Sequence, residues 1–337
     1  MSWSDLERAY TKRGLVLVVG AGLSFGCGLP SWRDLLQRIL TDDLHDPLQV
    51  GELEAQGLSL PAIASLIKER CEDRAQFVRR VRAALYRDFP YYRVGVGKSN
   101  RRAYVNYIRD HNPNLQAVAA LCARRRPDAP TYLTNPQVHA VVTFNLDALL
   151  QAYVYARYEK RLLRTVERPS AHSTPGKISI YHMHGFLRFD RRVDDLTKEA
   201  PDAMVLTEQN YFDFFNQPTS LFNYTFMYLL REYPCCFIGL SLRDDNIRRL
   251  LHYSKREQDE ALKREGVTDP AVLHRKLARH FAILESSGRP AIDRAVEQTL
   301  RPLGVTALWI ADFKTEEFTD RLAALYQSTG DDWNAVF

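Results

Sequence analysis

Two short segments contain side chains that could take part in acid–base chemistry. Thr-Phe-Asn-Leu-Asp carries Asn145 and Asp147, and His-Met-His-Gly carries His184. A histidine can take up a proton near neutral pH, and an amide or a carboxylate can orient a substrate or a water molecule. Each residue also has an ordinary structural alternative, because Asn145 or Asp147 could cap a helix and His184 could belong to the core. Their chemistry therefore depends on whether the fold brings the two segments together.

A metal site is a weaker alternative for the second segment. His182 and His184 fall on one face of a predicted strand, where two histidines could bind zinc. No third ligand is evident, and the cysteines show neither a C-x-x-C pair nor zinc spacing; they are Cys27, Cys71, Cys122, Cys235 and Cys236. We therefore expect no metal.

A third segment could bind phosphate. Gly20-Ala21-Gly22-Leu23-Ser24 follows an apolar run and precedes a predicted helix. Glycines there let the backbone approach a pyrophosphate, which then lies at a helix N-terminus. The dinucleotide fingerprint is not met, because Gly26 comes one residue late and the acidic pair at 42–43 follows a helix rather than a strand. An ordinary dehydrogenase is therefore not predicted.

A fourth segment reads Gly-Leu-Ser-Leu-Arg-Asp over 239–244 and again follows an apolar run. Ser241 could donate a hydrogen bond to a ribose or phosphate, and the alternative is that it merely caps the next helix. All four segments thus stand where a strand gives way to a turn.

Apolar runs and amphipathic stretches alternate along the chain. Strands are expected at 14–19, 140–143, 178–184, 235–240, 281–285 and 306–310, and helices at 30–40, 147–158, 220–232, 245–256, 293–300 and 315–329. This alternation predicts an α/β fold with a doubly wound, mostly parallel, Rossmann-like sheet, whose ligand lies beyond the carboxyl ends of the strands. We expect a single domain over 1–337, with a helical insert subdomain at 41–130 that includes an irregular connection at 91–114.

The composition is that of an ordinary globular protein, 45% hydrophobic and 26% charged over 337 residues. No apolar run is long enough to cross a bilayer, and residues 1–13 lack the apolar core of a signal peptide. The odd number of scattered cysteines is typical of reduced thiols. These features predict a cytoplasmic protein without membrane contact. The net charge of +5 could indicate an anionic partner, although solvated arginine faces are the commoner explanation.

Taken together, the order and spacing of the four segments resemble the sirtuin superfamily, over roughly Leu15 to Leu325. The resemblance rests on Gly-Ala-Gly-x-Ser with Gly-Leu-Pro-Ser-Trp-Arg, then Thr-Phe-Asn-Leu-Asp, His-Gly and Gly-Leu-Ser-Leu. Deacylase sirtuins carry a four-cysteine zinc ribbon, whereas no cysteine lies between Cys122 and Cys235 here. The chain is more similar to a zinc-free bacterial branch used in antiphage defence, whose members destroy NAD beside a sensor such as a short Argonaute or a DNA-translocating ATPase.

The resemblance implies that NAD is the substrate, and it implies a role for each matched residue. The pyrophosphate would be held by Gly20, Ala21, Gly22 and Ser24. The lid on the nicotinamide side would be shaped by Pro30, Trp32 and Arg33, and the adenosine ribose would face Gly239 and Ser241. The catalytic residues would be Asn145, which positions water or a ribose hydroxyl, and His184, the general base. Asp147 would orient the carboxamide.

The function expected from this resemblance is an NAD glycohydrolase effector that depletes NAD. The alternatives are an NAD-dependent protein deacylase and a non-catalytic nucleotide-binding subunit of a defence complex. A free NAD hydrolase would kill its host, so we expect a quiet isolated chain that is switched on by homo-oligomerisation, a partner sensor or indirect contact with nucleic acid. Basic residues of the insert could form that contact surface; they are Arg79, Arg80, Arg82, Arg101 and Arg102.

Overall fold

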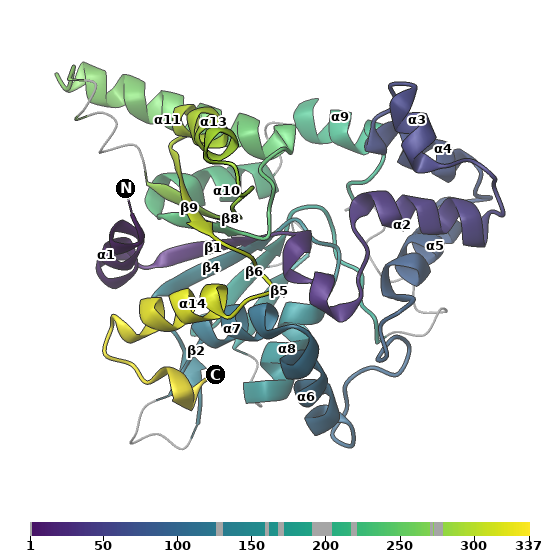
Figure 1. Cartoon of the computed structure of the whole chain (residues 1–337), viewed down its shortest axis with the longest axis horizontal. Helices are drawn as coiled ribbons and strands as arrows, with labels where there is room; N and C mark the ends of the chain where they lie inside the picture. The colour runs from purple at the N-terminus through teal and green to yellow at the C-terminus, as the bar shows by residue number, and fades with distance from the viewer. Residues whose placement is uncertain are drawn as a thin grey trace.

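A seven-stranded sheet forms the centre of the computed structural model, which describes residues 2–125, 131–158, 162–167, 172–190, 204–216, 221–269, 272 and 279–337 (Figure 1). The strand order is β5-β6-β4-β1-β7-β8-β9, and every neighbouring pair is parallel. The strands are β1 (Leu15–Val19), β4 (Val138–Thr143), β5 (Leu163–Val166), β6 (Ile178–His182), β7 (Cys235–Ile238), β8 (His280–Glu285) and β9 (Val305–Ile310). The predicted doubly wound α/β fold is confirmed.

Helices cover both faces of this sheet, which is why its central strands are apolar on both sides. Leu15, Leu17 and Val19 of β1 pack into the core on one face, and Val16 and Val18 pack into the core on the other. The first face is covered by α1 (Trp3–Arg13), α6 (Arg101–His111), α7 (Pro113–Leu121), α8 (Leu149–Tyr158) and α14 (Glu317–Gln327). The second is covered by α10 (Leu221–Glu232), α11 (Asp245–Arg264) and α13 (Pro290–Leu300).

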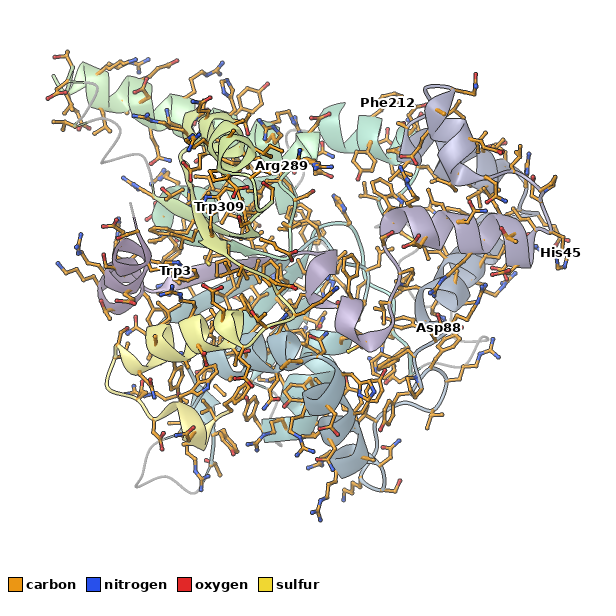
Figure 2. The ribbon with its side chains drawn as sticks, viewed as in Figure 1. Trp3, His45, Asp88, Phe212, Arg289 and Trp309 are labelled. Atoms are coloured by element: carbon orange, nitrogen blue, oxygen red, sulfur yellow. The ribbon has the colours of Figure 1, made fainter. Side chains whose placement is uncertain are left out.

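A further group of helices stands beyond the carboxyl ends of the strands. Its members are α2 (Trp32–Arg38), which continues as a π-turn (Ile39–Asp43), then α3 (Val50–Ala55), α4 (Leu60–Glu69), α5 (Arg74–Tyr86) and α9 (Glu208–Asn216). The backbone N–H of Glu208 donates to the Ser65 hydroxyl at 3.0 Å and ties α9 to α4. Figure 2 shows Phe212 of α9 beside the α3–α4 pair. Residues far apart in the sequence therefore meet in this group.

Within 41–130, the helices divide between two places. The α3–α5 segment packs with α2 and α9, whereas α6 and α7 pack against α8 below the sheet. The insert boundaries stay a prediction. The irregular connection expected at 91–114 is wrong, because α6 occupies Arg101–His111. Only Tyr104 and Ile108, one helical turn apart, are fully buried in this otherwise polar helix, so its apolar stripe is too narrow to stand out in the sequence.

Two smaller expectations also change. The strand predicted to reach His184 ends at His182, so the two histidines do not share a strand face. Arg82 is only 1% exposed, and it cannot belong to the basic contact surface proposed for the insert. Among the residues that the structure describes, no helix combines the length and the apolar character that a membrane span requires.

Candidate active site

The chain reverses its winding direction at β1. From β1 it moves to β4 on one side, and β7 later adds to the other side of β1. In such sheets the ligand crevice opens beyond the carboxyl ends of the strands at this switch point. A cavity of about 410 Å³ lies there. Its lining includes most of the residues singled out in the sequence, namely Ala21, Gly22, Ser24, Pro30, Trp32, Asn145, Asp147, His184, Gly239 and Ser241.

A second cavity of about 630 Å³ adjoins the first. The two share Gly22, Phe25 and the turn at 239–241. The second is otherwise lined by the start of α7 and by the ends of β8 and β9, including the side chains of Asn114, Glu285 and Lys314. Two compartments thus meet over the glycine loop and the turn after β7.

Part of the boundary between the cavities is a backbone contact that only glycine permits. The N–H of Gly22 donates to the carbonyl oxygen of Gly239 at 3.0 Å. A Cβ on Gly22 would lie 2.9 Å from Gly239 Cα, and a Cβ on Gly239 would lie 2.7 Å from the nitrogen of Leu23. Gly239 also has φ +66°, in the left-handed region. These glycines therefore bring the turns after β1 and β7 into direct contact.

Buried and half-buried polar side chains fix the shape of the glycine loop. Asn145 Nδ2 donates to the Gly20 carbonyl oxygen at 2.9 Å, and it lies 3.4 Å from Ser24 Oγ. The Ser24 hydroxyl donates to Asp147 Oδ2 at 2.7 Å, and the N–H of Leu149 donates to Asp147 Oδ1 at 3.0 Å. Burial raises the pKa of Asp147, and these hydrogen bonds oppose the rise. Asn145 and Asp147 thus position the loop, whatever further role they have.

His184 lies in the turn after β6 and borders the cavity within an aromatic group. Its ring meets Phe144 edge-on at 5.0 Å and Tyr211 at 5.8 Å between centroids. Tyr211, on α9, stacks in turn on Trp32 of α2 at 5.8 Å. The α9 segment reaches this position because the N–H of Val205 donates to the His184 carbonyl oxygen at 2.9 Å.

A carboxylate stands on the other side of this group. The Tyr211 hydroxyl donates to Asp244 Oδ2 at 3.3 Å. Asp244 is also the N-cap of α11, because its Oδ1 accepts the backbone N–H of Asn246. Burial lowers the pKa of His184, and the negative charge of Asp244 partly opposes this. His184 is consequently held neutral near pH 7, the form that a general base requires.

His182 faces away from this cavity. The Gln151 amide donates to its Nε2, and His182 Nδ1–H donates to the Asn145 carbonyl oxygen at 3.2 Å. Burial lowers its pKa to about 4. His182 therefore supports the backbone of Asn145 as a neutral core residue. Among the described residues, no group of three or more His, Cys, Asp or Glu is placed to hold a metal ion.

Two of the predicted site residues do not line the cavity. Gly20 does not border the cavity, and its carbonyl oxygen accepts the hydrogen bond from Asn145 Nδ2. Arg33 pairs with Glu54 of α3 at 2.6 Å, on the outer side of α2. The predicted role of Arg33 in the lid stays a prediction, and the pairing of its side chain with Glu54, away from the cavity, does not favour it.

Sequence reasoning missed Tyr211 and assigned no role to Asp244. Asp244 stands three residues after Ser241, within the fourth segment, so its position was a signal. Tyr211 carries none, because its neighbours in the chain resemble those of any amphipathic helix and its partners Trp32 and Asp244 are distant in sequence.

The comparison with known families bears on this geometry. Residues 139–301 match the model of the SIR2-like domain. The match supports a place in the sirtuin-like superfamily, whose SIR2-like domains are generally NAD-dependent enzymes. The matched range holds Asn145, His184, Ser241 and Tyr211, and the glycine loop lies outside it. No curated protein matches the chain.

Proposed function

We propose that this chain is an NAD glycohydrolase, which hydrolyses NAD to nicotinamide and ADP-ribose. The observation that carries the proposal is that Asn145, His184, Gly22 and Ser241 line one cavity at the switch point of the sheet. They do so in a chain whose residues 139–301 match the SIR2-like domain.

The two adjoining cavities suit the two halves of a dinucleotide. In this proposal the pyrophosphate crosses the Gly22–Gly239 contact, where a side chain would obstruct it. The adenosine half occupies the cavity of about 630 Å³, where Glu285 can accept hydrogen bonds from ribose hydroxyls. The nicotinamide half occupies the cavity of about 410 Å³. The indole N–H of Trp32 is buried there without a hydrogen-bond partner among the described residues, and a carboxamide oxygen would satisfy it.

The chemistry requires a neutral base and an oriented bond. Water attacks the C1′ carbon of the nicotinamide ribose, and the bond from C1′ to the pyridinium nitrogen breaks. Its electron pair neutralises the departing ring, so the ribose carbon develops positive charge in the transition state. His184, held neutral by burial, accepts the proton of the attacking water and later releases it to solvent. The network of Asn145, Ser24 and Asp147 holds the loop rigidly, so the reacting atoms stay aligned.

The resemblance of the motifs to zinc-free defence proteins supports a proposal for the biological role. We propose that the chain acts as a single NAD-binding domain over 1–337, as the effector of an antiphage system that depletes NAD. A homo-oligomer or a partner sensor, of the ATPase or short Argonaute type, would release its activity. The α2–α5 group is a candidate for the moving part, since α2 carries Trp32 of the cavity wall.

The decisive test is incubation of the purified chain with NAD, with and without an acetylated peptide and each candidate activator, followed by chromatography of the products. We expect nicotinamide and ADP-ribose, linear or cyclised, without any need for the peptide. His184→Gln should abolish this, and His172→Gln, at an exposed histidine, should not. Peptide-dependent loss of NAD with release of the acyl group would establish a deacylase instead. Intact NAD under every condition, with measurable NAD binding, would establish a non-catalytic nucleotide-binding subunit.

A further inference from the structure

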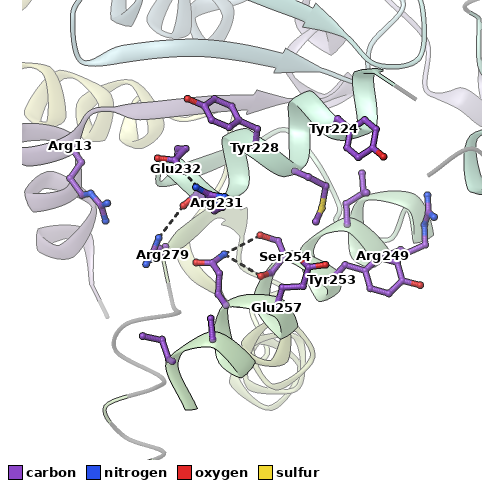
Figure 3. Close-up of a pocket in the computed structure, with 15 residues that line it drawn as sticks. Arg13, Tyr224, Tyr228, Arg231, Glu232, Arg249, Tyr253, Ser254, Glu257 and Arg279 are labelled. Carbon is purple, nitrogen blue, oxygen red and sulfur yellow. Dashed lines mark hydrogen bonds and ion pairs between the residues drawn. The ribbon is translucent and has the colours of Figure 1, made fainter. Parts of the chain in front are cut away.

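A long groove on the far side of the molecule carries aromatic and cationic side chains that the proposed activity does not use. It lies between α10 and α11, encloses about 820 Å³, and opens toward the amino ends of β1, β7 and β8 (Figure 3). Arg13, Arg231 and Arg279, each placed shortly before one of those strands, line that end of it. The cavities of the candidate active site lie at the opposite, carboxyl ends of the strands.

The groove is built from one face of each helix. Along α10 the lining residues recur at helical spacing, as Tyr224, Met227, Tyr228, Arg231 and Glu232. Along α11 they run from Arg249 to Leu262, thirteen residues further on, which corresponds to about 20 Å at 1.5 Å per residue. The groove is therefore elongated and favours an extended ligand over a compact one.

Three tyrosines line this groove. Tyr224 and Tyr228 are each 55% exposed on α10, and Tyr253 is 38% exposed on α11. Figure 3 shows the first two on the α10 side and Tyr253 on the α11 side. The guanidinium of Arg256 lies 5.2 Å from the ring centre of Tyr253. Exposed aromatic rings offer flat apolar faces on which a planar ligand group can stack.

The charge of the groove is positive among the residues that the structure describes. Four arginines line this part of it (Arg13, Arg231, Arg249 and Arg279) against two glutamates (Glu232 and Glu257), which gives these residues a net charge of +2. Glu232 is already paired with Arg231 at 2.9 Å. An acidic or polyanionic ligand is therefore favoured.

We propose that this groove binds single-stranded nucleic acid. Open bases stack on exposed aromatic rings, and arginines that border a groove contact the phosphates; this combination is the usual basis of sequence-tolerant single-strand binding. Stacked nucleotides rise about 3.4 Å each, so a groove of about 20 Å spans roughly six of them. A duplex would not offer its bases to the tyrosines. An acidic peptide would match the charge but would leave the three rings without a stacking partner.

The test is fluorescence anisotropy with a fluorescein-labelled oligothymidylate of about 12 nucleotides, on the whole chain and without NAD, so that the result is independent of the proposed activity. We expect binding at about 50 mM salt that weakens steeply toward about 200 mM. Replacing Tyr224 and Tyr228 together by alanine should weaken binding at least about tenfold, whereas replacing both by phenylalanine should preserve it, because stacking needs the ring and not the hydroxyl. Arg231→Gln, at a side chain that is 72% exposed, should reduce the slope of log affinity against log salt by about 0.7.

The matched control is Tyr155→Ala with Arg109→Gln, which changes an exposed tyrosine and an exposed arginine on the other face of the sheet; Arg109 pairs with the adjacent Asp110 as Arg231 does with Glu232. It should bind as the wild type does, and circular dichroism should show every variant folded. Absence of binding at the lowest salt, or equal binding by the tyrosine-to-alanine variant, would overturn the proposal. So would equally tight competition by polyglutamate, which would assign the groove to an acidic protein.

Discussion

The Tyr211 hydroxyl donates a hydrogen bond of 3.3 Å to Asp244, and the ring of the same tyrosine lies edge-on against His184. One residue of α9 thus connects the candidate base to the carboxylate that caps α11. As in hydrolytic sites where a carboxylate lies beside the general base, the negative charge of Asp244 raises the pKa of the neutral His184 imidazole.

This relationship predicts a shift in the pH profile. The carboxylate of Asp244 raises the pKa of His184 against the effect of burial, and a base is active only above its pKa. Asp244→Asn should therefore lower that pKa further and move the acidic limb of kcat/KM for NAD to lower pH. The amide still caps α11, and Asp245→Asn, at the exposed neighbouring position, should leave the limb in place. An acidic limb that moves upward would contradict the assignment of His184 as the base.

Asn145 predicts a combined loss of activity and stability. Asn145→Ala removes the donor to the Gly20 carbonyl oxygen inside the loop, so kcat should fall about 100-fold or more. The free energy of unfolding should fall by about 1–3 kcal/mol, because a buried acceptor is left without its donor. Asn145→Asp should be no better, since its carboxylate would face that carbonyl oxygen. Turnover assays and urea titrations measure both effects, and near-normal kcat in either variant would exclude the positioning role.

Neighbouring residues Trp32 and Arg33 should behave in opposite ways. Trp32 borders the cavity and stacks on Tyr211, so Trp32→Ala should raise the KM for NAD about tenfold, and Trp32→Phe should raise it less. Arg33 pairs with Glu54 at 59% side-chain exposure, so Arg33→Ala should leave KM within about twofold. A larger effect at Arg33 than at Trp32 would show that the lid closes differently when NAD binds.

Two buried histidines predict acid sensitivity. Burial lowers the pKa of His182 to about 4 and that of His280 to about 3, from an ordinary value of 6.5. As pH falls, each histidine is protonated in the unfolded chain at a higher pH than in the folded chain. The free energy of unfolding is therefore greatest above pH 6.5 and decreases as pH falls toward the folded-state pKa. From pH 7 to pH 5 the loss should be about 2 kcal/mol per histidine, because one pKa unit corresponds to about 1.4 kcal/mol.

Urea unfolding at the two pH values measures this loss. His280→Asn should reduce the pH dependence of stability, because it removes one buried titrating group. The variant should stay folded, because the amide oxygen can still accept the Cys235 N–H that His280 Nδ1 accepts now. His172→Gln, at an exposed histidine, should not change it. A wild-type chain equally stable at both pH values would show that neither histidine stays neutral in the folded state.

The sequence predicted six of the seven strands and the four turns that follow them, because buried strands and glycine turns are local features. It missed the edge strand β5, which is only partly buried and has no continuous apolar run. It could not predict which neighbours face the cavity. Trp32 borders the cavity, whereas the adjacent Arg33 pairs with Glu54 on the outer side of α2, and their order in the chain does not show which of the two faces inward. Nor could it separate His182 from His184, since that depended on the strand ending two residues early. Tyr211 enters only through tertiary packing of α9, which no local pattern encodes.

Part of the ridge between the two cavities is main chain, where Gly22 contacts Gly239. A ridge of side chains could rotate aside or be trimmed by mutation, whereas this one can do neither without separating β1 from β7. A small molecule that fills one cavity can therefore be extended across the Gly22–Gly239 contact into the other cavity only by a thin, flexible linker. Mutations that give resistance to such a compound are expected at other residues that line the cavities, since neither Gly22 nor Gly239 tolerates a larger side chain.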